Sequence, residues 1–271
     1  MSRAYAAKLA QETMAILERG HYTAPSGRVV RIDALRDEAV ARTEDFPPER
    51  PVAVVPSPGY EPRFEVTNES TLTAAARLAA GRPAVLNFAS AKNPGGGFLS
   101  GAHAQEESLA RSSALYSCLA GRPMYAYHQE RPNPLYSHWA IYSPDVPVFR
   151  SNEGPLREAL YTCAFVTCPA VNAGAVQKNR PADVSRILPI MRERVHRVLA
   201  IMAQKGHDTL VLGAWGCGVF GNDAADIALL FRQALDADFA KTFRHVVFAV
   251  LDGSPERRFI RPFEEHFLRA S

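Results

Sequence analysis

Apolar residues along the chain recur at two spacings, and these predict a succession of helices and strands. Residues 184–204 place apolar side chains on one stripe at helical spacing, which predicts a long amphipathic helix. Apolar runs of strand length occur at 84–89, 164–168, 209–213 and 245–251. Because such runs alternate with helices, we expect an α/β fold in which helices cover both faces of a central sheet.

Weaker features of the same kind predict the other elements. A helix over 2–19 stops at Gly20, which favours a helix end, and Ser70 can cap the start of another helix. The proline-rich stretch 46–62 is expected to be a surface connection. The remaining helices are expected at 33–42, 70–80, 105–119, 224–240 and 256–268, and the remaining strands within 21–32, at 64–67 and at 139–142.

Composition narrows the class of protein. The net charge of +3 is small and no Lys/Arg-rich run is present, so direct nucleic-acid binding is not expected. No apolar run is long enough for a transmembrane helix, and the N-terminus does not look like a signal peptide. The four cysteines have no metal-type spacing, so we expect reduced, buried thiols and a cytoplasmic location. The length of 271 residues allows one large domain or two small ones.

The segment from Asn93 to Glu107 joins a triple glycine, Gly95–Gly97, to Gln105 and two adjacent acids. It directly follows the apolar run 84–89, so it lies at a strand end, where functional loops of such sheets gather. Glycines let a backbone approach a ligand closely, and acids beside them can transfer protons. We therefore expect acid–base chemistry next to a tightly held polar substrate.

The two acids, Glu106 and Glu107, are not equivalent. Neighbours on a helix point about 100° apart, so they cannot stand on opposite sides of one sugar as the carboxylates of a retaining glycosidase do. One acid is expected to face the reacting bond as a general acid, and the other to hold a hydroxyl group or a water. The helix dipole lowers the pKa of a carboxyl group in the first turn, so desolvation by the bound substrate must raise the pKa of the general acid by more. The simpler alternative is that both acids only stabilise the first turn of a helix.

A second glycine-rich loop, Gly213–Gly221, lies between an expected strand and an expected helix. Its glycines leave backbone N–H groups free to surround an anion, and the following helix N-terminus adds positive potential, so a diphosphate is the expected guest. The alternative is a tight turn that binds nothing. The loop lacks the Gly-Lys-Ser/Thr end of a Walker A motif and is not an N-terminal dinucleotide fingerprint. Phe220 either covers a sugar or base or packs into the core.

Together, the Gly95–Gly97 and Gln105-Glu106-Glu107 motif and the loop at 213–221 resemble the bacterial-type poly(ADP-ribose) glycohydrolases, a branch of the macrodomain superfamily. The resemblance covers nearly the whole chain, and the first motif is the specific one, since ADP-ribose-reading macrodomains keep only the second loop. It implies a macrodomain-like three-layer α/β/α fold with a mixed central sheet. Residues 1–62 would form an N-terminal helical extension packed on a catalytic core at 63–271.

The resemblance also implies a hydrolase that cuts ribose–ribose bonds of poly(ADP-ribose) and releases ADP-ribose, with no cofactor or metal required. Glu107 would be the general acid and base at an oxocarbenium-like ribose, and Glu106 would contact ribose hydroxyls near the bond. Poly(ADP-ribose), ADP-ribose and poly(ADP-ribosyl)ated proteins would be the partners of a monomer. The bulk of Phe220 would favour cleavage at chain ends. The substrate-binding residues would come from both motifs: Gly95, Gly96, Gly97, Gln105, Gly216, Cys217, Gly218, Val219, Phe220 and Gly221.

Several alternatives stay open on the residues alone. The chain could be a non-catalytic module that reads ADP-ribose, although a reader has no need of paired acids beside the ribose, or a hydrolase of other ADP-ribosyl adducts. His103 is either a surface loop residue or one that acts as a catalytic base or a phosphate contact. Asp223 and Asp226 more simply start a helix than bind a metal. Phe259 and Phe263 are equally plausible as adenine contacts and as core.

Overall fold

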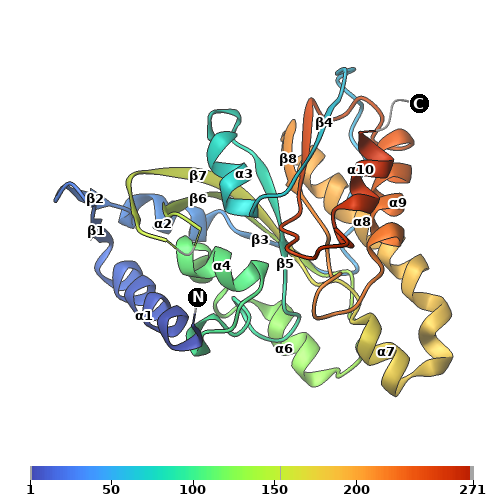
Figure 1. Cartoon of the computed structure of the whole chain (residues 1–271), viewed down its shortest axis with the longest axis horizontal. Coiled ribbons are helices and arrows are strands. Elements are labelled where there is room, and N and C mark those ends of the chain that lie inside the picture. The colour runs from blue at the N-terminus through green and yellow to red at the C-terminus, as the bar shows by residue number, and fades with distance from the viewer. Residues whose placement is uncertain (1, 153, 269–271) are drawn as a thin grey trace.

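The computed structural model describes residues 2–152 and 154–268, which form a seven-stranded mixed sheet at the centre of the molecule (Figure 1). The strand order is β3–β6–β7–β5–β8–β9–β4. Five neighbouring strands run parallel, namely β4 (Arg63–Thr67), β9 (His245–Ala249), β8 (Thr209–Leu212), β5 (Ala84–Phe88) and β7 (Leu156–Cys168). Two further strands extend the sheet in antiparallel pairs, β6 (Ala140–Arg150) beside β7 and β3 (Glu44–Phe46) beside β6.

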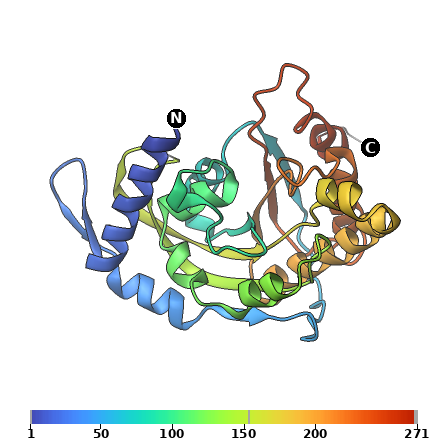
Figure 2. The same cartoon turned by 90° about the horizontal axis from the view of Figure 1, so that it is seen from below.

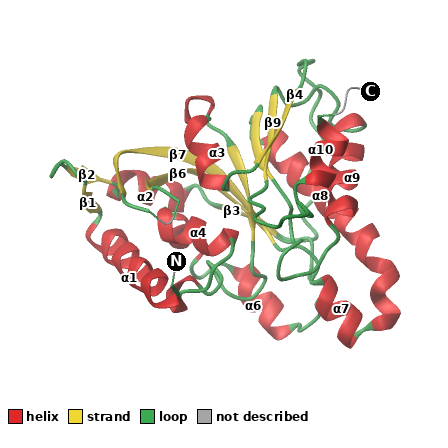
Figure 3. Cartoon of the chain, viewed as in Figure 1, coloured by secondary structure: helices red, strands yellow, loops and turns green. Residues whose placement is uncertain are grey.

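Alternate residues of the central strands point to opposite faces of the sheet. Val85 and Val211 belong to the hydrophobic core on one face, whereas Leu86 and Leu212 belong to the core on the other. Both faces are therefore apolar and each is covered by helices, as Figure 3 shows. This confirms the predicted three-layer α/β/α fold with a mixed central sheet.

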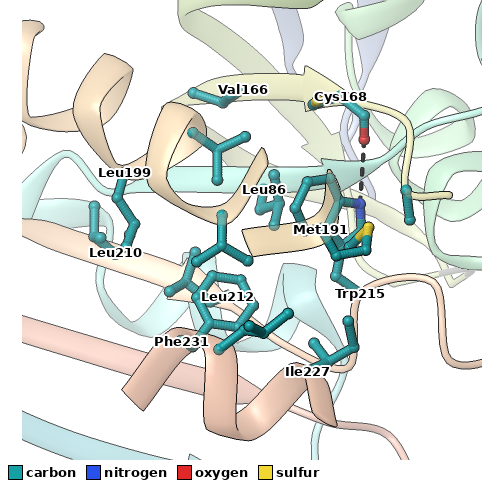
Figure 4. Close-up of a cluster of buried hydrophobic side chains, with 14 of the residues drawn as sticks. Leu86, Val166, Cys168, Met191, Leu199, Leu210, Leu212, Trp215, Ile227 and Phe231 are labelled. Carbon is teal, nitrogen blue, oxygen red and sulfur yellow. Dashed lines mark hydrogen bonds between the residues drawn. The ribbon is translucent and has the colours of Figure 1, made fainter. Parts of the chain in front are cut away.

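One face is covered by helices from the C-terminal half of the chain. They are α8 (Ile187–Gln204), α9 (Ala224–Asp236) and α10 (Arg261–Phe267), with α7 (Ala173–Asn179) and the 3₁₀ segment η3 (Pro181–Arg186) leading into α8. Figure 4 shows Leu199 of α8 and Phe231 of α9 packed on Leu86, Leu210 and Leu212 of the sheet. These apolar contacts fix the direction in which β8 delivers the loop that follows it.

The opposite face is covered by helices from the N-terminal half. They are α1 (Arg3–Arg19), α2 (Asp33–Ala41), α3 (Thr71–Arg77), α4 (Gln105–Ser112), α5 (Leu115–Leu119) and α6 (Pro123–Glu130). The short 3₁₀ turn η1 (Ala79–Gly81) follows α3 and has no buried residue. Ser2 caps α1 by accepting the N–H of Tyr5 at 3.2 Å, and Gly20 ends it with a left-handed φ of 77°, as the sequence predicts. The expected strands within 21–32 form a hairpin of β1 (His21–Thr23) and β2 (Val29–Arg31).

The N-terminal helix also reaches the first glycine-rich motif. Arg3 Nε donates to the carbonyl of Ser100 at 2.9 Å, and Thr13 Oγ1 donates to the carbonyl of Arg111. Ser100 ends the short 3₁₀ turn η2 (Phe98–Ser100), and Arg111 lies in α4. In Figure 2, α1 (dark blue) accordingly lies beside the green segment that carries α4. The extension thus holds the loop and the helix of the motif together.

Local structure departs from the sequence-based prediction in several places. The helix expected at 105–119 breaks after α4, because Ser113 is extended and forms a β-bridge with Val148 before α5 begins. The stretch 123–147 contains the unpredicted helix α6, with Pro123 in its first turn where its missing N–H costs nothing. Strand β6 runs far beyond the expected 139–142, because β7 covers most of its length.

The N-terminal segment is not wholly helical. β3 lies within residues 1–62 and pairs with β6, so this segment also supplies an edge strand of the main sheet. The division of the chain at residue 62 stays a prediction. Within the described residues, no helix is both long and apolar enough to cross a membrane. The four cysteines are buried and unbridged: Cys118, Cys163, Cys168 and Cys217.

Candidate active site

A cavity of about 680 Å³ lies at the carboxyl ends of β5, β8 and β9, where ligand sites of such sheets are found. Both glycine-rich segments border it, although more than a hundred positions separate them in the sequence. Most of the predicted site residues line it, namely Gly96, Gly97, Gln105, Glu106, Glu107, Gly216, Cys217, Gly218, Val219 and Phe220. Gly95 and Gly221 stand behind this lining, each at a positive φ that shapes its loop.

The triple glycine allows both acids to converge on one backbone position. Gly96 has a φ of 61°, and a Cβ on it would lie 2.3 Å from Glu107 Oε1 and 3.1 Å from Glu106 Oε2. Glu107 Oε1 and Glu106 Oε2 therefore lie no farther from each other than the sum of these two distances. Since any larger residue at 96 would displace Glu107, the glycine is a steric requirement of the acid pair. The two acids lie on the same side of the cavity, as the helix geometry predicts.

Glu106 is the buried member of the pair. Its side chain is 3% exposed, and it accepts hydrogen bonds from the N–H of Ser90 at 2.6 Å and from Asn87 Nδ2 at 3.4 Å. Burial raises the pKa of Glu106 to about 8; the hydrogen bond from Ser90 opposes this shift and the negative charge of Glu107 adds to it. Glu106 therefore carries a proton at neutral pH.

Glu107 is held by one oxygen and free at the other. Oε1 accepts the N–H of Gly97 at 2.9 Å. No described residue donates a hydrogen bond to Oε2, and the side chain borders the cavity. An acid fixed at one oxygen and open at the other has the arrangement that a general acid and base needs.

Gln105 joins the start of α4 to the end of β5. Its Oε1 accepts the N–H of Phe88 at 2.9 Å, while its Nε2 donates to the carbonyl of Leu86 at 2.7 Å and to Thr71 Oγ1 at 3.2 Å. Both N–H groups of the amide are used within the protein. These bonds set the position of the two acids that follow. A direct contact between Gln105 and substrate stays a prediction.

The second loop is locked by contacts behind it. Gly216 has a φ of 75°, and a Cβ there would lie 2.6 Å from Ala170 Cβ. Asn222 Nδ2 donates to the carbonyls of Val171 and Gly216, and the buried Trp215 donates its Nε1–H to the carbonyl of Cys168 at 3.2 Å (Figure 4). The loop is therefore rigid before any ligand arrives.

Several backbone N–H groups of this loop have no hydrogen-bond acceptor in the described part of the chain. The N–H groups of Gly216, Gly218, Val219 and Phe220 meet no acceptor in the described part of the chain, whereas those of Cys217 and Gly221 bond within the loop. Unpaired N–H groups in a glycine-rich loop that leads into a helix can bind an anion. The geometry thus favours the predicted diphosphate seat over a turn that binds nothing.

The side chains of the loop have different environments. Phe220 borders the cavity and also packs, its ring centroid 6.0 Å from that of Tyr136. Val219 is 88% exposed, so its side chain is open to solvent. Cys217 is buried, and burial raises the pKa of its thiol, which leaves it unreactive as a nucleophile.

The two aromatic residues considered as adenine contacts differ in burial. Phe263 is fully buried, whereas Phe259 borders the cavity. Asp252 holds the segment that carries Phe259 by accepting the N–H groups of Phe259 at 2.7 Å and Ile260 at 3.1 Å. Desolvation acts to raise the pKa of Asp252, but these bonds and those from Ser254 lower it to about 2.

Some site residues escaped the sequence reasoning. Asn87 donates to both Glu106 and Thr167 Oγ1, and a lone asparagine within an apolar strand is the feature that could have revealed it. His103 borders the cavity. Asp223 caps α9 by accepting the N–H of Ala225 at 2.7 Å, which confirms its helix-start role. Among the described residues, no group of His, Cys, Asp and Glu is placed to hold a metal ion.

Comparisons with known proteins agree on one family. Residues 10–151 match the family model described as "Microbial-type PARG, catalytic domain", where PARG denotes poly(ADP-ribose) glycohydrolase. The solved poly(ADP-ribose) glycohydrolase of Thermomonospora curvata is 48% identical, with a TM-score of 0.91 over 97% of this chain and 99% of that one. The same enzyme bound to the inhibitor ADP-HPD is 50% identical, with a TM-score of 0.90 and the same coverage. The Deinococcus radiodurans enzyme in complex with ADP-ribose is 43% identical, with a TM-score of 0.83 over 88% of this chain and 98% of that one. A search of curated proteins finds no match.

Proposed function

We propose a mechanism by which this chain, which belongs to the microbial-type poly(ADP-ribose) glycohydrolases, cleaves poly(ADP-ribose). It is a glycosidic-bond hydrolase, and its substrate is poly(ADP-ribose). The observation that carries the assignment of residues is the convergence of Glu106 and Glu107 on Gly96, beside a cavity that the second loop, with its unpaired N–H groups, also lines.

The terminal ADP-ribose unit would occupy the cavity through its diphosphate and its base. The free N–H groups of residues 216, 218, 219 and 220 would receive the diphosphate oxygens. Phe259 would stack on the adenine, since its ring borders the cavity and its segment is fixed by Asp252. The related enzymes bind ADP-ribose and ADP-HPD, and the volume of this cavity suits a ligand of that size.

Glu107 would carry out both proton transfers. In its acid form it would deliver the proton on Oε2 to the ribose oxygen that leaves as the glycosidic bond breaks, while the buried Glu106 keeps its own proton. The remaining ribose carries oxocarbenium-like positive charge, and the Glu107 carboxylate lies beside it. Glu107 would then take a proton from a water whose oxygen attacks C1″, which restores the pair and releases ADP-ribose. Glu106 would hold a ribose hydroxyl during both steps.

The substitution Glu107→Gln tests this assignment. It keeps the size of the side chain and its bond to Gly97 but removes the transferable proton, so release of ADP-ribose from labelled polymer should fall by about 10²–10⁴-fold. Affinity for ADP-ribose, measured by calorimetry, should change less than about threefold, since the diphosphate seat is untouched. Glu130→Gln, at an acid of α6 outside the cavity, is the matched control. A Glu107→Gln enzyme that turns over at near-normal rate would show that another group is the acid.

We further propose that the chain acts as a cytoplasmic monomer on polymer attached to proteins, including polymer made in the DNA damage response. Its buried, unbridged cysteines suit a reducing compartment. The bulk of Phe220 beside the cavity favours removal of terminal units. Light scattering tests the monomer, and the length distribution of residual polymer tests the mode of cleavage.

A further inference from the structure

A second cavity of about 360 Å³ adjoins the first one. It lies between α3 and residues 150–152 at the end of β6, and Leu72 and Asn152 line both cavities. Ser108, the residue after Glu107, donates its hydroxyl hydrogen to Asn152 Oδ1 at 2.7 Å. The second cavity therefore begins next to the acid pair, and no residue of the 213–221 loop lines it.

Three of the described residues that line this second cavity are arginines. Arg77, Arg150 and Arg157 border it together with Leu72, Ala76 and three polar residues, and no Asp or Glu among the described residues does. We call it the arginine cavity. A guanidinium group that is not neutralised by a carboxylate can bind a phosphate through two parallel hydrogen bonds.

The three guanidinium groups differ in how far they are neutralised. Arg77 pairs with Glu65 and Glu69, and the buried Arg150 pairs with Glu12 at 2.7 Å. Arg150 nevertheless keeps an Nε–H that has no partner in the described part of the chain.

Arg157 is the arginine that is ready to bind. It makes no ion pair with a described carboxylate, and its one hydrogen bond runs from Nε to the carbonyl of Ala159 at 3.3 Å. Its guanidinium carbon lies 5.0 Å from the centre of the Tyr161 ring, and Tyr161 in turn donates to the carbonyl of Leu72 at 3.1 Å. Stacking on this ring orients the group while both Nη atoms stay free for a phosphate.

We propose that the arginine cavity binds the diphosphate of the ADP-ribose unit on the leaving side of the scissile bond. This inference rests on the proposed function, which places the terminal unit on the 213–221 loop and the bond at Glu107. The group that leaves is the adenosine ribose of the next unit, and its diphosphate is attached to that same ribose. A polymer thus presents a second anion close beyond the acid pair, where the arginine cavity begins.

The substitution Arg157→Gln tests the proposal. Removing a charge-assisted contact to phosphate should lower kcat/KM on poly(ADP-ribose) about tenfold at low salt. The same variant should keep its kcat/KM on an ADP-ribosyl substrate with a small uncharged leaving alcohol, and its affinity for ADP-ribose. Arg157→Lys keeps the charge and should recover part of the loss. Arg186→Gln, at an exposed arginine of η3 that lines neither cavity, should match the wild-type enzyme on both substrates.

A second perturbation works by repulsion. Ala76→Glu places a carboxylate in the lining and should also reduce activity on the polymer while sparing the small substrate. Equal loss on both substrates, or no loss on either, would overturn the proposal. So would a loss confined to polymer attached to protein, because the cavity would then bind the acceptor. If the wild-type enzyme released no ADP-ribose from polymer at all, the proposed function itself would fail, which is a different result.

Discussion

Replacing Gly96 by alanine probes the feature on which the site depends most. The new Cβ would stand 2.3 Å from Glu107 Oε1 and 2.9 Å from its Cδ, far inside van der Waals contact. The Glu107 side chain must therefore move and give up its hydrogen bond to the N–H of Gly97. The backbone offers no relief, since the φ of 61° already disfavours any residue with a Cβ.

The magnitude follows from these two effects. A left-handed conformation costs about 1–2 kcal/mol for a residue other than glycine, and a hydrogen bond to a charged group contributes about 1.5–3 kcal/mol. A total of about 2.5–5 kcal/mol would lower the Tm by about 5–20 °C for a domain of this size. Activity should suffer more, because a catalytic group displaced by about 1 Å can lose about 100-fold in rate.

The assay combines polymer hydrolysis, thermal unfolding and ADP-ribose binding on the same variant. Gly121→Ala is the matched control, because Gly121 has a similar φ of 76° but no atom within 4 Å of a built Cβ. It should show the backbone strain, about 1–2 kcal/mol, without loss of catalysis. If Gly96→Ala kept kcat within about threefold of wild type, the convergence of the acids on Gly96 would not matter for turnover.

Two further predictions concern the second loop and the buried acid. Gly218→Ala adds a methyl group that meets no protein atom within 4 Å, so it should leave Tm unchanged but raise the Kd for ADP-ribose. Gly216→Ala should instead lower Tm, because its new Cβ would lie 2.6 Å from neighbouring atoms. A Gly218→Ala protein with normal affinity for ADP-ribose would show that the ligand binds elsewhere. The pKa of Glu106 is raised on folding, so its protonated form favours the folded state at pH 4 and this stability is lost as pH rises through about 8. Glu106→Gln should therefore raise Tm relative to wild type more at pH 8 than at pH 5, and an equal effect at both pH values would contradict the raised pKa.

Local sequence features predicted most of the elements but not their limits. The apolar run 84–89 and the amphipathic pattern at 184–204 carry periodicities that leave few alternatives, and both elements formed. The helix expected at 105–119 broke because Ser113 bonds across to β6, a partner that no local pattern reveals. β3 escaped notice for the same reason, since three residues make an edge strand only when β6 lies beside them.

The candidate site divides in the same way. The sequence by itself determined the chemistry available, because residue types and spacing supply the triple glycine, the adjacent acids and a loop of free amides. Only the tertiary structure decided how the acids differ: burial keeps the proton on Glu106 against the opposing hydrogen bonds from Ser90 and Asn87, and the bond to Gly97 leaves one oxygen of Glu107 open. Charge state depends on desolvation and on neighbours in space, and these arise only when β5, β8 and the helices have packed.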